Sequence, residues 1–214
     1  MATIQFNDVS RIFQRDGKDF LILDKIQLLV QDREFVAIVG PSGCGKTTCM
    51  RMAAGLEFPS SGTVKVNDVV VTEPGPDRAV VFQQFALFPW KTVQDNIDFG
   101  LRSKGIAKDE REHLIAHYIA LMNLKGYESA YPHQLSGGMQ QRVAIARALI
   151  NSPSVIMGDE PTGNLDSKNS RAVQEIFKQL AQEHGQTIIC VTHDNDFANN
   201  TDRIIEMQDG LILS

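Results

Sequence analysis

The stretch Gly40-Pro-Ser-Gly-Cys-Gly-Lys-Thr47 decides the fold of this sequence. It fits the pattern G-x-x-x-x-G-K-[ST], in which a glycine-rich loop wraps its backbone N–H groups around phosphate oxygens. The loop follows an apolar run, Phe35–Val39, and precedes a helical run, Thr47–Gly55. This context disfavours a chance glycine-rich turn. A strand, a phosphate loop and a helix in this order predict an α/β nucleotide-binding fold.

We expect the whole phosphate loop to lie against a bound nucleotide. Lys46 would reach the β- and γ-phosphates, the Thr47 hydroxyl would hold Mg²⁺, and Thr48 would add a contact to an inner phosphate. The following helix N-terminus adds about half a positive charge. Cys44 is interpreted as a small side chain that the loop tolerates, rather than as a redox sensor. The expected nucleotide-binding residues of the loop are Gly40, Pro41, Ser42, Gly43, Cys44, Gly45, Lys46, Thr47 and Thr48.

Two acids, Asp159 and Glu160, end the apolar run Val155-Ile-Met-Gly-Asp-Glu160. Acids at a strand end are often only solvated, but a phosphate loop upstream favours a functional interpretation. Asp159 is suited to hold Mg²⁺ through its water shell. Glu160 is suited to polarise the water that attacks the γ-phosphate. The sequence therefore predicts ATP and Mg²⁺ as cofactors.

Apolar, β-rich runs alternate with helical patterns, which predicts an α/β fold with a mainly parallel sheet. Asn67-Asp68 lies between two short valine-rich runs and predicts a hairpin at an antiparallel β edge. A second tight turn is expected at 208–210. The expected strands are Phe35–Val39, Ala79–Phe82, Val155–Met157, Thr187–Val191 and Arg203–Met207, and the expected helices between Phe82 and Val155 are Thr92–Arg102, Lys108–Leu124 and Gly137–Ile150.

The composition is that of a globular protein of 214 residues, 43% of them hydrophobic, with a formal net charge of -5. This charge argues against a general nucleic-acid binder, which usually has a strong basic excess. Cys44, Cys49 and Cys190 lack the spacing of disulfides or metal ligands and fit a reducing compartment. We see no signal-peptide pattern and no apolar run of membrane-spanning length. We therefore expect a cytosolic chain that reaches a membrane only through a partner.

Leu135-Ser-Gly-Gly-Met-Gln-Gln-Arg142, here called the signature segment, is the most diagnostic stretch. Ser136 is a natural helix N-cap, and two glycines expose backbone N–H groups at the helix start. This predicts a second phosphate-binding surface on a chain with one phosphate loop. With this segment, the sequence resembles the ABC-transporter ATPases over essentially its whole length. The resemblance implies that Ser136, Gly137 and Gly138 close on ATP held by the opposite subunit of a dimer.

The resemblance also implies a phosphate-loop NTPase core of the RecA type, formed by residues 1–84 and 151–214. A helical signature subdomain would occupy 85–150, and 1–214 would form a single ABC ATPase domain. Met139 stands where the family often has glutamine. A simple kinase or GTPase would lack the signature segment. A soluble non-transport ABC ATPase stays a further alternative, although one of DNA repair or translation would normally carry a coiled-coil insert or a second cassette, and neither is present.

Four further site residues follow from the resemblance alone. Phe13 matches the aromatic residue that stacks on adenine, although a core phenylalanine is the alternative. Gln83 matches the glutamine that contacts Mg²⁺ and senses the membrane partner. Asp166 matches the aspartate that crosses the dimer interface, and His193 matches the γ-phosphate switch. The candidate Mg²⁺ ligands are thus Thr47, Gln83 and Asp159, and the candidate catalytic residues are Lys46, Gln83, Glu160 and His193.

Three stretches are similar to importer ATPases for nitrate, sulfonates and taurine: 74–78, 87–90 and 131–134. Glu160-Pro-Thr-Gly-Asn-Leu-Asp166 instead resembles ATPases of lipoprotein release and macrolide export. We favour import of a small solute such as an oxyanion or sulfonate, with export as the alternative. The expected partners are a second ATPase subunit, permease subunits and, for an importer, an extracytoplasmic solute-binding protein. This arrangement places the chain at the cytoplasmic face of the membrane.

The apolar stretch Phe85–Trp90, directly after Gln83, is open to two interpretations. Exposed apolar surface commonly marks a binding site, so a short helix of the permease could dock there. Alternatively, the same side chains could fill the core between the two lobes.

Overall fold

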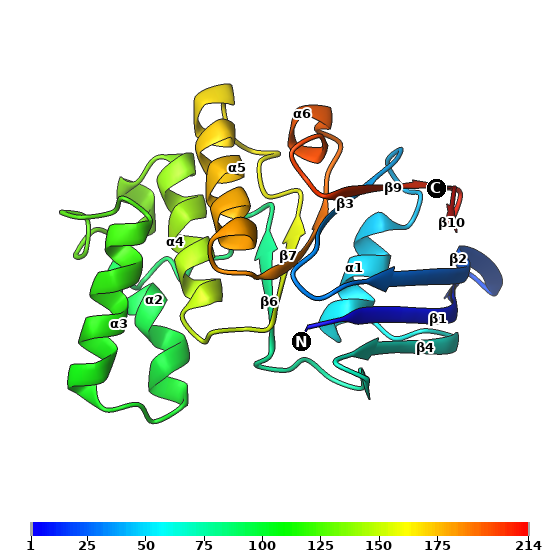
Figure 1. The fold of residues 1–214 in the computed structure, drawn as a ribbon, viewed down its shortest axis with the longest axis horizontal. Coiled ribbons are helices and arrows are strands. Elements are labelled where there is room, and N and C mark those ends of the chain that lie inside the picture. The colour runs from blue at the N-terminus through cyan, green and yellow to red at the C-terminus, as the bar shows by residue number, and fades with distance from the viewer. Residues whose placement is uncertain (1, 214) are drawn as a thin grey trace.

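The computed structural model describes residues 2–213, which form two β-sheets and a group of helices (Figure 1). The six-stranded sheet has the strand order β10-β9-β3-β8-β7-β6, and the four-stranded sheet has the order β2-β1-β4-β5. The strands are β1 (Ile4–Arg15), β2 (Lys18–Val30), β3 (Phe35–Val39), β4 (Ser61–Val66), β5 (Val69–Val70), β6 (Arg78–Phe82), β7 (Val155–Asp159), β8 (Thr187–Val191), β9 (Arg203–Gln208) and β10 (Leu211–Ile212). The helices are α1 (Lys46–Ala54), α2 (Val93–Ser103), α3 (Lys108–Leu121), α4 (Gly137–Leu149), α5 (Ser167–Gln182) and α6 (Asn195–Ala198), with a 3₁₀ turn at Pro132–Gln134.

The larger sheet is parallel except for its short last strand. Strands β9, β3, β8, β7 and β6 pair in parallel, and β10 returns antiparallel to β9. The parallel sheet and the separate antiparallel sheet confirm the predicted α/β fold class. The five predicted parallel strands are present, and the turn at Asn67-Asp68 joins β4 to β5.

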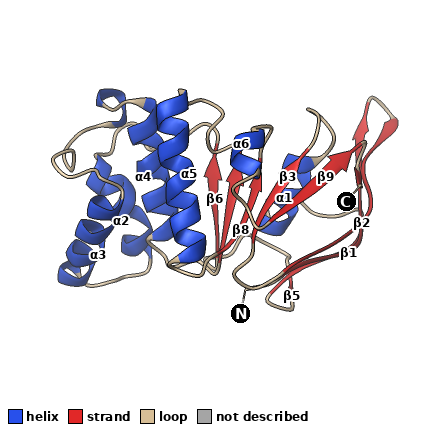
Figure 2. Cartoon of the chain, turned by 45° about the horizontal axis from the view of Figure 1, so that its top comes forward, coloured by secondary structure: helices blue, strands red, loops and turns tan. Residues whose placement is uncertain are grey.

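Helix α1 lies between the two sheets, and the other helices cover the opposite face of the parallel sheet (Figure 2). Successive side chains of a strand point to opposite faces. Accordingly, Ile189 of β8 packs into the core around α1, whereas Ile188 packs into the core beneath the helices. Phe35, Phe177 and Phe197 form an aromatic cluster in that second core, with ring centroids 5.9–6.4 Å apart. Both faces of the sheet are therefore buried.

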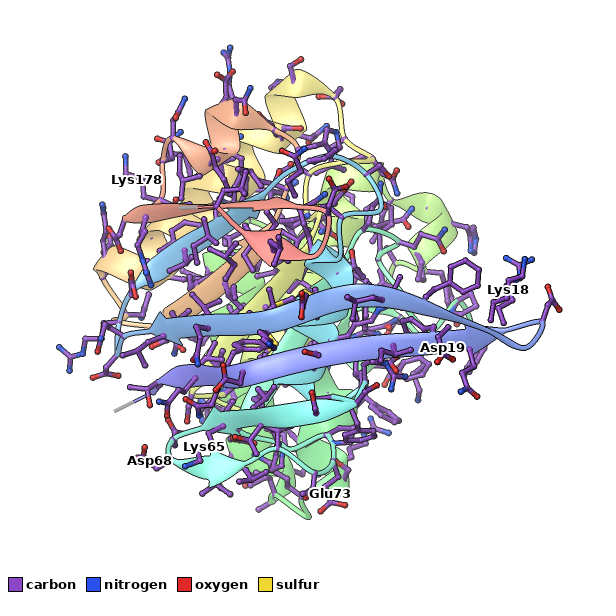
Figure 3. The ribbon with its side chains drawn as sticks, turned by 90° about the vertical axis from the view of Figure 1, so that its right-hand side faces the viewer. Lys18, Asp19, Lys65, Asp68, Glu73 and Lys178 are labelled. Atoms are coloured by element: carbon purple, nitrogen blue, oxygen red, sulfur yellow. The ribbon has the colours of Figure 1, made fainter. Side chains whose placement is uncertain are left out.

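The long β1–β2 hairpin was not predicted from the sequence. Its two strands pair antiparallel from Ile4 with Val30 to Arg15 with Lys18, and the register shifts three times on the way. Such bulges break the regular alternation on which strand prediction depends. Figure 3 shows this sheet from outside, with Lys18 and Asp19 at the tip of the hairpin. The hairpin brings Phe13 to the edge of the phosphate loop, as described below.

The segment between β6 and β7 contains α2, α3 and α4 and no strand, as the sequence predicted. Thr92 caps α2 by accepting a hydrogen bond from Asp95 N, and Ser136 caps α4 by accepting one from Met139 N. Helix α5 was missed, although Val173, Phe177 and Leu180 bury one stripe of it at helical spacing. The division into 1–84, 85–150 and 151–214 stays a prediction. Among residues 2–213, no helix is both long enough and apolar enough to cross a membrane.

Candidate functional site

The phosphate loop borders an open pocket of about 290 Å³ between α1 and the β1–β2 hairpin. The pocket combines backbone from the loop, hydroxyls and an ammonium group from the start of α1, and an aromatic ring from β1. Its lining residues are Phe13, Ile22, Ser42, Gly43, Gly45, Lys46, Thr47, Thr48 and Glu160. The predicted loop residues Gly40, Pro41 and Cys44 lie outside this lining.

Two glycines of the loop are required by the close approach of neighbouring strands. Gly45 has a φ of 104°, and a Cβ there would lie 2.6 Å from Leu23 Cδ2 and 2.9 Å from the Ile22 carbonyl oxygen of β2. Gly40 has a φ of 151°, and a Cβ there would overlap the Met207 carbonyl oxygen of β9. A side chain at either position would be strained and would also clash. The loop is therefore held tightly between β2 and β9.

Lys46 is directed back into the loop that carries it. Its Nζ donates hydrogen bonds to the carbonyl oxygens of Gly40 and Pro41, both at 2.8 Å, and the side chain is 6% exposed. Gly40 and Pro41 thus contribute carbonyl groups that orient the ammonium group. Cys44 is buried, with Sγ 3.9 Å from Lys46 Nζ. Its thiol is part of the core around α1, in agreement with its interpretation as a tolerated small side chain.

Thr47 and Asp159 meet beside the pocket although 112 residues separate them. The Thr47 hydroxyl donates a hydrogen bond to Asp159 Oδ1 at 2.9 Å. Asp159 is the last residue of β7 and pairs with Phe82 of β6 and Val191 of β8. The strand register therefore brings the segments that follow these three strands to one edge of the sheet. A hydroxyl and a carboxylate side by side are oxygen donors of the kind that Mg²⁺ takes together with phosphate and water.

Glu160 and His193 face each other at the same edge. His193 Nδ1 lies 3.1 Å from Glu160 Oε2, and Glu160 N donates to the Val191 carbonyl at 2.9 Å. Glu160 has a φ of 48°, a left-handed conformation that is uncommon for a non-glycine residue and that clusters at functional sites. The side chains of Gln83 and Glu160 both approach Gly163. A Cβ at Gly163 would lie 2.9 Å from Gln83 Nε2 and 3.3 Å from Glu160 Oε2.

Gln83 does not line the pocket in this structure. Its Nε2 lies 3.5 Å from Asn164 Oδ1, and its carbonyl accepts a hydrogen bond from Asn164 Nδ2 at 3.0 Å. The contact with Asn164 uses Nε2, whereas a contact with Mg²⁺ would use Oε1, so the predicted role of Gln83 at Mg²⁺ stays a prediction.

Phe13 lines the pocket as expected for a residue that stacks on a base. Its ring is 37% exposed, and the Arg11 guanidinium lies over it at 4.4 Å from the ring centroid. Arg11 is also paired with Glu57. Sequence reasoning missed Arg11, because β1 was not predicted as a strand; within a strand, residues two apart such as Arg11 and Phe13 lie on the same face. One face of the Phe13 ring is thus covered by a cation.

The comparison with known protein families accounts for these features together. Residues 23–163 match the family described as ABC transporter. The chain belongs to the ABC transporter family. An uncharacterised ABC transporter ATP-binding protein of Methanocaldococcus jannaschii is 45% identical over 195 residues, which cover 91% of this chain and 73% of that protein. This membership identifies the chain as an ATP-binding and ATP-hydrolysing ABC ATPase.

Two further relatives carry the names of importers. The nitrate import ATP-binding protein NrtD of Synechocystis is 41% identical over 191 residues, covering 89% of this chain and 72% of that protein. The spermidine/putrescine import ATP-binding protein PotA of Marinobacter nauticus is 43% identical over 203 residues, covering 93% and 54%. Among solved structures, a dimeric ATP-binding cassette in a post-hydrolysis state with ADP and Pi has a TM-score of 0.89 and 33% identity, covering 99% of this chain and 97% of that one.

The signature segment of this ABC ATPase lies apart from its phosphate loop. None of Ser136, Gly137, Gly138 and Asp166 lines the pocket. Ser136 caps α4 and Asp166 caps α5, where Asn169 N donates to Asp166 Oδ1 at 2.9 Å. This backbone hydrogen bond, together with one from the Asn169 side chain, lowers the pKa of Asp166. Within one chain, the structure does not bring these four predicted site residues to the nucleotide pocket.

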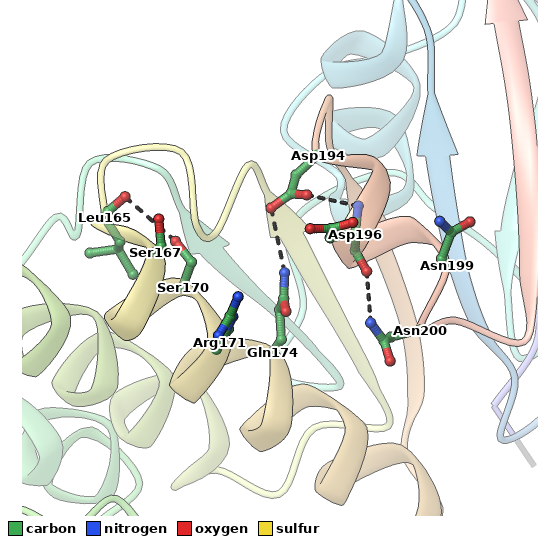
Figure 4. A pocket seen from close by; sticks show the side chains of 9 residues that line it. All are labelled: Leu165, Ser167, Ser170, Arg171, Gln174, Asp194, Asp196, Asn199 and Asn200. Atoms are coloured by element: carbon green, nitrogen blue, oxygen red, sulfur yellow. Dashed lines mark hydrogen bonds between the residues drawn. The ribbon is translucent and has the colours of Figure 1, made fainter.

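A larger open cavity of about 510 Å³ lies between α5 and the segment after β8 (Figure 4). Gln174 Nε2 donates to Asp194 Oδ2 across it at 3.4 Å, and Asp194 Oδ1 accepts from Asp196 N at 2.9 Å. The cavity contains no phosphate-loop residue. The smaller pocket beside Lys46, which the phosphate loop lines, is therefore the candidate nucleotide site.

Proposed function

We propose that this ABC ATPase works as a dimer in which each ATP lies between the phosphate loop of one chain and the signature segment of the other. The observation that carries this proposal is the separation of Ser136 from the pocket that Lys46 lines. Ser136–Gly138 starts a helix whose first N–H groups form a natural phosphate-binding arrangement. The phosphate loop of the same chain lies elsewhere, so the phosphate would belong to ATP held by the other chain. The dimeric solved relative supports the same assembly.

The roles of the pocket residues follow from their positions. Lys46 would place its positive charge on the transferred phosphoryl group, and Phe13 would offer an apolar face to the base. Mg²⁺ held near Thr47 and Asp159 would neutralise phosphate charge. Glu160 would orient the attacking water and accept its proton, while His193 holds the carboxylate in place. Phosphoryl transfer depends mainly on such positioning and charge stabilisation.

A mixing experiment tests the composite site. Lys46→Ala removes the phosphate-loop cation, and Ser136→Ala removes the signature hydroxyl. Neither homodimer should hydrolyse ATP, but a mixture can form heterodimers with one intact site. Partial recovery of ATPase activity in the mixture is the expected result. No recovery, under conditions where tagged chains are shown to form heterodimers, would argue for a site built within one chain.

Import of a small solute such as an oxyanion or a sulfonate is the transport function that we favour. The importer-like stretches at 74–78, 87–90 and 131–134 and the importer relatives support this direction. The chain would then act at the cytoplasmic face of the membrane with permease subunits and a solute-binding protein. Purification of the tagged chain with its membrane partner, followed by mass spectrometry, identifies that partner. Reconstituted ATPase activity that rises with nitrate or taurine, and not with spermidine, would support the oxyanion class.

Export or lipoprotein release is the second candidate. Its support is the stretch Glu160–Asp166, in which Asn164 contacts both the side chain and the carbonyl of Gln83. A copurified partner that operates without any solute-binding protein would favour this candidate over import.

The surface after Gln83 is a candidate docking site for the permease. Trp90 is 71% exposed, whereas Phe88 is half-buried with its ring 4.6 Å from that of Phe99. Buried Asn96 shapes this loop by accepting from Phe88 N at 2.9 Å and donating to the Lys91 carbonyl at 3.0 Å. The exposure of Trp90 supports docking at this stretch, whereas the packing of Phe88 supports a structural role. Phe88 partly packs, and Trp90 is presented to solvent.

A further inference from the structure

Gln141 is a fully buried polar side chain of the signature helix α4 that no role described above uses. Its Nε2 donates to the Pro161 carbonyl at 2.6 Å and lies 3.4 Å from the Phe82 carbonyl. Pro161 directly follows Glu160, and Phe82 directly precedes Gln83. One amide of the signature helix therefore contacts the backbone on which both of these site residues depend.

The orientation of this amide is determined by its partners. Both contacts are carbonyl oxygens, which only accept hydrogen bonds, so the NH₂ group must face them. The other end, Oε1, has no hydrogen-bond partner among the described residues. A buried acceptor without a partner lowers stability. An apolar side chain would remove this acceptor but would also leave the Pro161 carbonyl without its Gln141 donor.

The segment that Gln141 contacts has an unusual backbone conformation. Glu160 has a φ of 48° and is followed by Pro161, which has no N–H group to anchor it. A strained backbone conformation of this kind persists only where several surrounding contacts hold it in place. Glu160 N is bound by the Val191 carbonyl, and the Glu160 carbonyl accepts from Gly163 N at 3.0 Å. Gln141 adds a side-chain hydrogen bond to the Pro161 carbonyl, between these two backbone anchors.

We propose that Gln141 is a positioning residue that ties the signature helix to the Glu160 carboxylate and to Gln83. It lies five residues after Ser136, about 7.5 Å along the helix axis at 1.5 Å per residue. A shift of the helix N-terminus on contact with phosphate would thus be transmitted to Pro161 and Phe82. The proposal rests on the proposed role of Glu160 and adds a connection within each chain. The signature segment would serve the partner's nucleotide and, through Gln141, align the chain's own catalytic carboxylate.

The test compares Gln141→Met with Gln141→Asn in the full-length protein. Methionine keeps the length and removes the donors, whereas asparagine keeps the amide but is one methylene too short to keep both contacts. The matched control is Thr187→Val, because the buried Thr187 hydroxyl likewise donates to a backbone carbonyl, that of Ala2, at the opposite end of the parallel strands. Steady-state ATPase kinetics, affinity for a fluorescent ATP analogue and thermal midpoints are measured for all three.

Both Gln141 variants should lower kcat tenfold or more while KM and ATP-analogue affinity stay within about twofold of wild type, because only alignment for the chemical step is lost. Thr187→Val should lower the thermal midpoint without changing kcat. A kcat within twofold of wild type in either folded Gln141 variant would overturn the proposal. So would equal kcat losses in the Gln141 and Thr187 variants, or failure of both Gln141 variants to fold. A Glu160→Gln variant with normal turnover would instead overturn the proposed role of Glu160.

Discussion

His193 and Glu160 contact each other through Nδ1 and Oε2 at 3.1 Å, although they follow different strands, β8 and β7. The imidazole is largely exposed, and the carboxylate is 26% exposed. This contact involves the Glu160 carboxylate, which lines the pocket beside Lys46. It makes the pair a unit whose members can be tested separately.

Glu160→Gln should retain ATP binding and lower kcat at least 100-fold, because the loss of a general base typically costs a factor of 10²–10⁴. The ATP-loaded variant should also elute as a dimer in size-exclusion chromatography. Glu175→Gln is the matched control, since Glu175 is exposed on α5 and lies outside the pocket. Turnover near the wild-type rate in the Glu160 variant would remove this residue from the role of base.

His193→Ala should lower kcat with little change in ATP affinity, because the carboxylate loses the group that orients it. The decrease should be smaller than that of Glu160→Gln, since the carboxylate itself remains. His184→Ala serves as the control, because His184 is exposed beyond the end of α5. If the His193 variant weakens ATP binding in proportion to its lost activity, then His193 contributes to binding rather than to positioning.

Gly138→Ala and Gly137→Ala form a matched pair in the first turn of α4. A Cβ at Gly138 would overlap Asn169 Oδ1 and Cγ and lie 2.8 Å from Asn169 Cβ, which would displace the residue that Asp166 caps. A Cβ at Gly137 would be 3.6 Å from its nearest neighbours. Without nucleotide, Gly138→Ala should destabilise the fold by about 1 kcal/mol or more in urea unfolding, and Gly137→Ala should be neutral or stabilising. Equal stabilities would refute this difference.

Trp90→Ser and Phe88→Ser should separate docking from packing. Trp90→Ser should change stability by less than about 0.5 kcal/mol and leave ATPase activity intact, as for most surface substitutions, while permease binding is lost. Phe88→Ser should cost more stability, because Phe88 contacts Phe99 and lies 5.6 Å from the Arg147 guanidinium carbon. A Trp90→Ser chain that still copurifies with its permease would exclude Trp90 from the docking surface.

Alkaline pH should destabilise the protein through its buried thiols. Burial raises the pKa of Cys49 to about 12, and it also raises the pKa of Cys190. In the unfolded chain these thiols ionise near pH 8.5. Their stabilising contribution is therefore complete below that pH and is lost as pH rises toward 12, at up to about 1.4 kcal/mol per pH unit for each thiol. Urea unfolding at pH 7.5 and 9.5 should show a smaller pH effect in Cys49→Ala than in wild type.

The sequence by itself determined the parts of this protein that depend on contiguous residues. Gly40–Thr47, the acids after the apolar run 155–158, and the N-cap Ser136 could all be recognised from local patterns, because each is a short backbone conformation with its own residue preferences. The same reasoning predicted the parallel strands and the three helices of 83–154. It missed the β1–β2 hairpin, whose bulges hide the alternation, and with that strand it missed Arg11, which lies beside Phe13 on the same face of β1.

Only the tertiary structure decided which of these parts meet. The register of three parallel strands puts Asp159 against Phe82 and Val191, and so brings Thr47 to Asp159 and His193 to Glu160. Parallel pairing joins strands that are distant along the chain, so no local pattern specifies its register. The contacts of Gln141 could not be predicted from the sequence either, because its neighbours in the sequence predict only that it lies on a helix. Its contact with Pro161 exists only because α4 packs against β6 and places Gln141 beside Phe82, which ends β6, and Pro161, which follows β7.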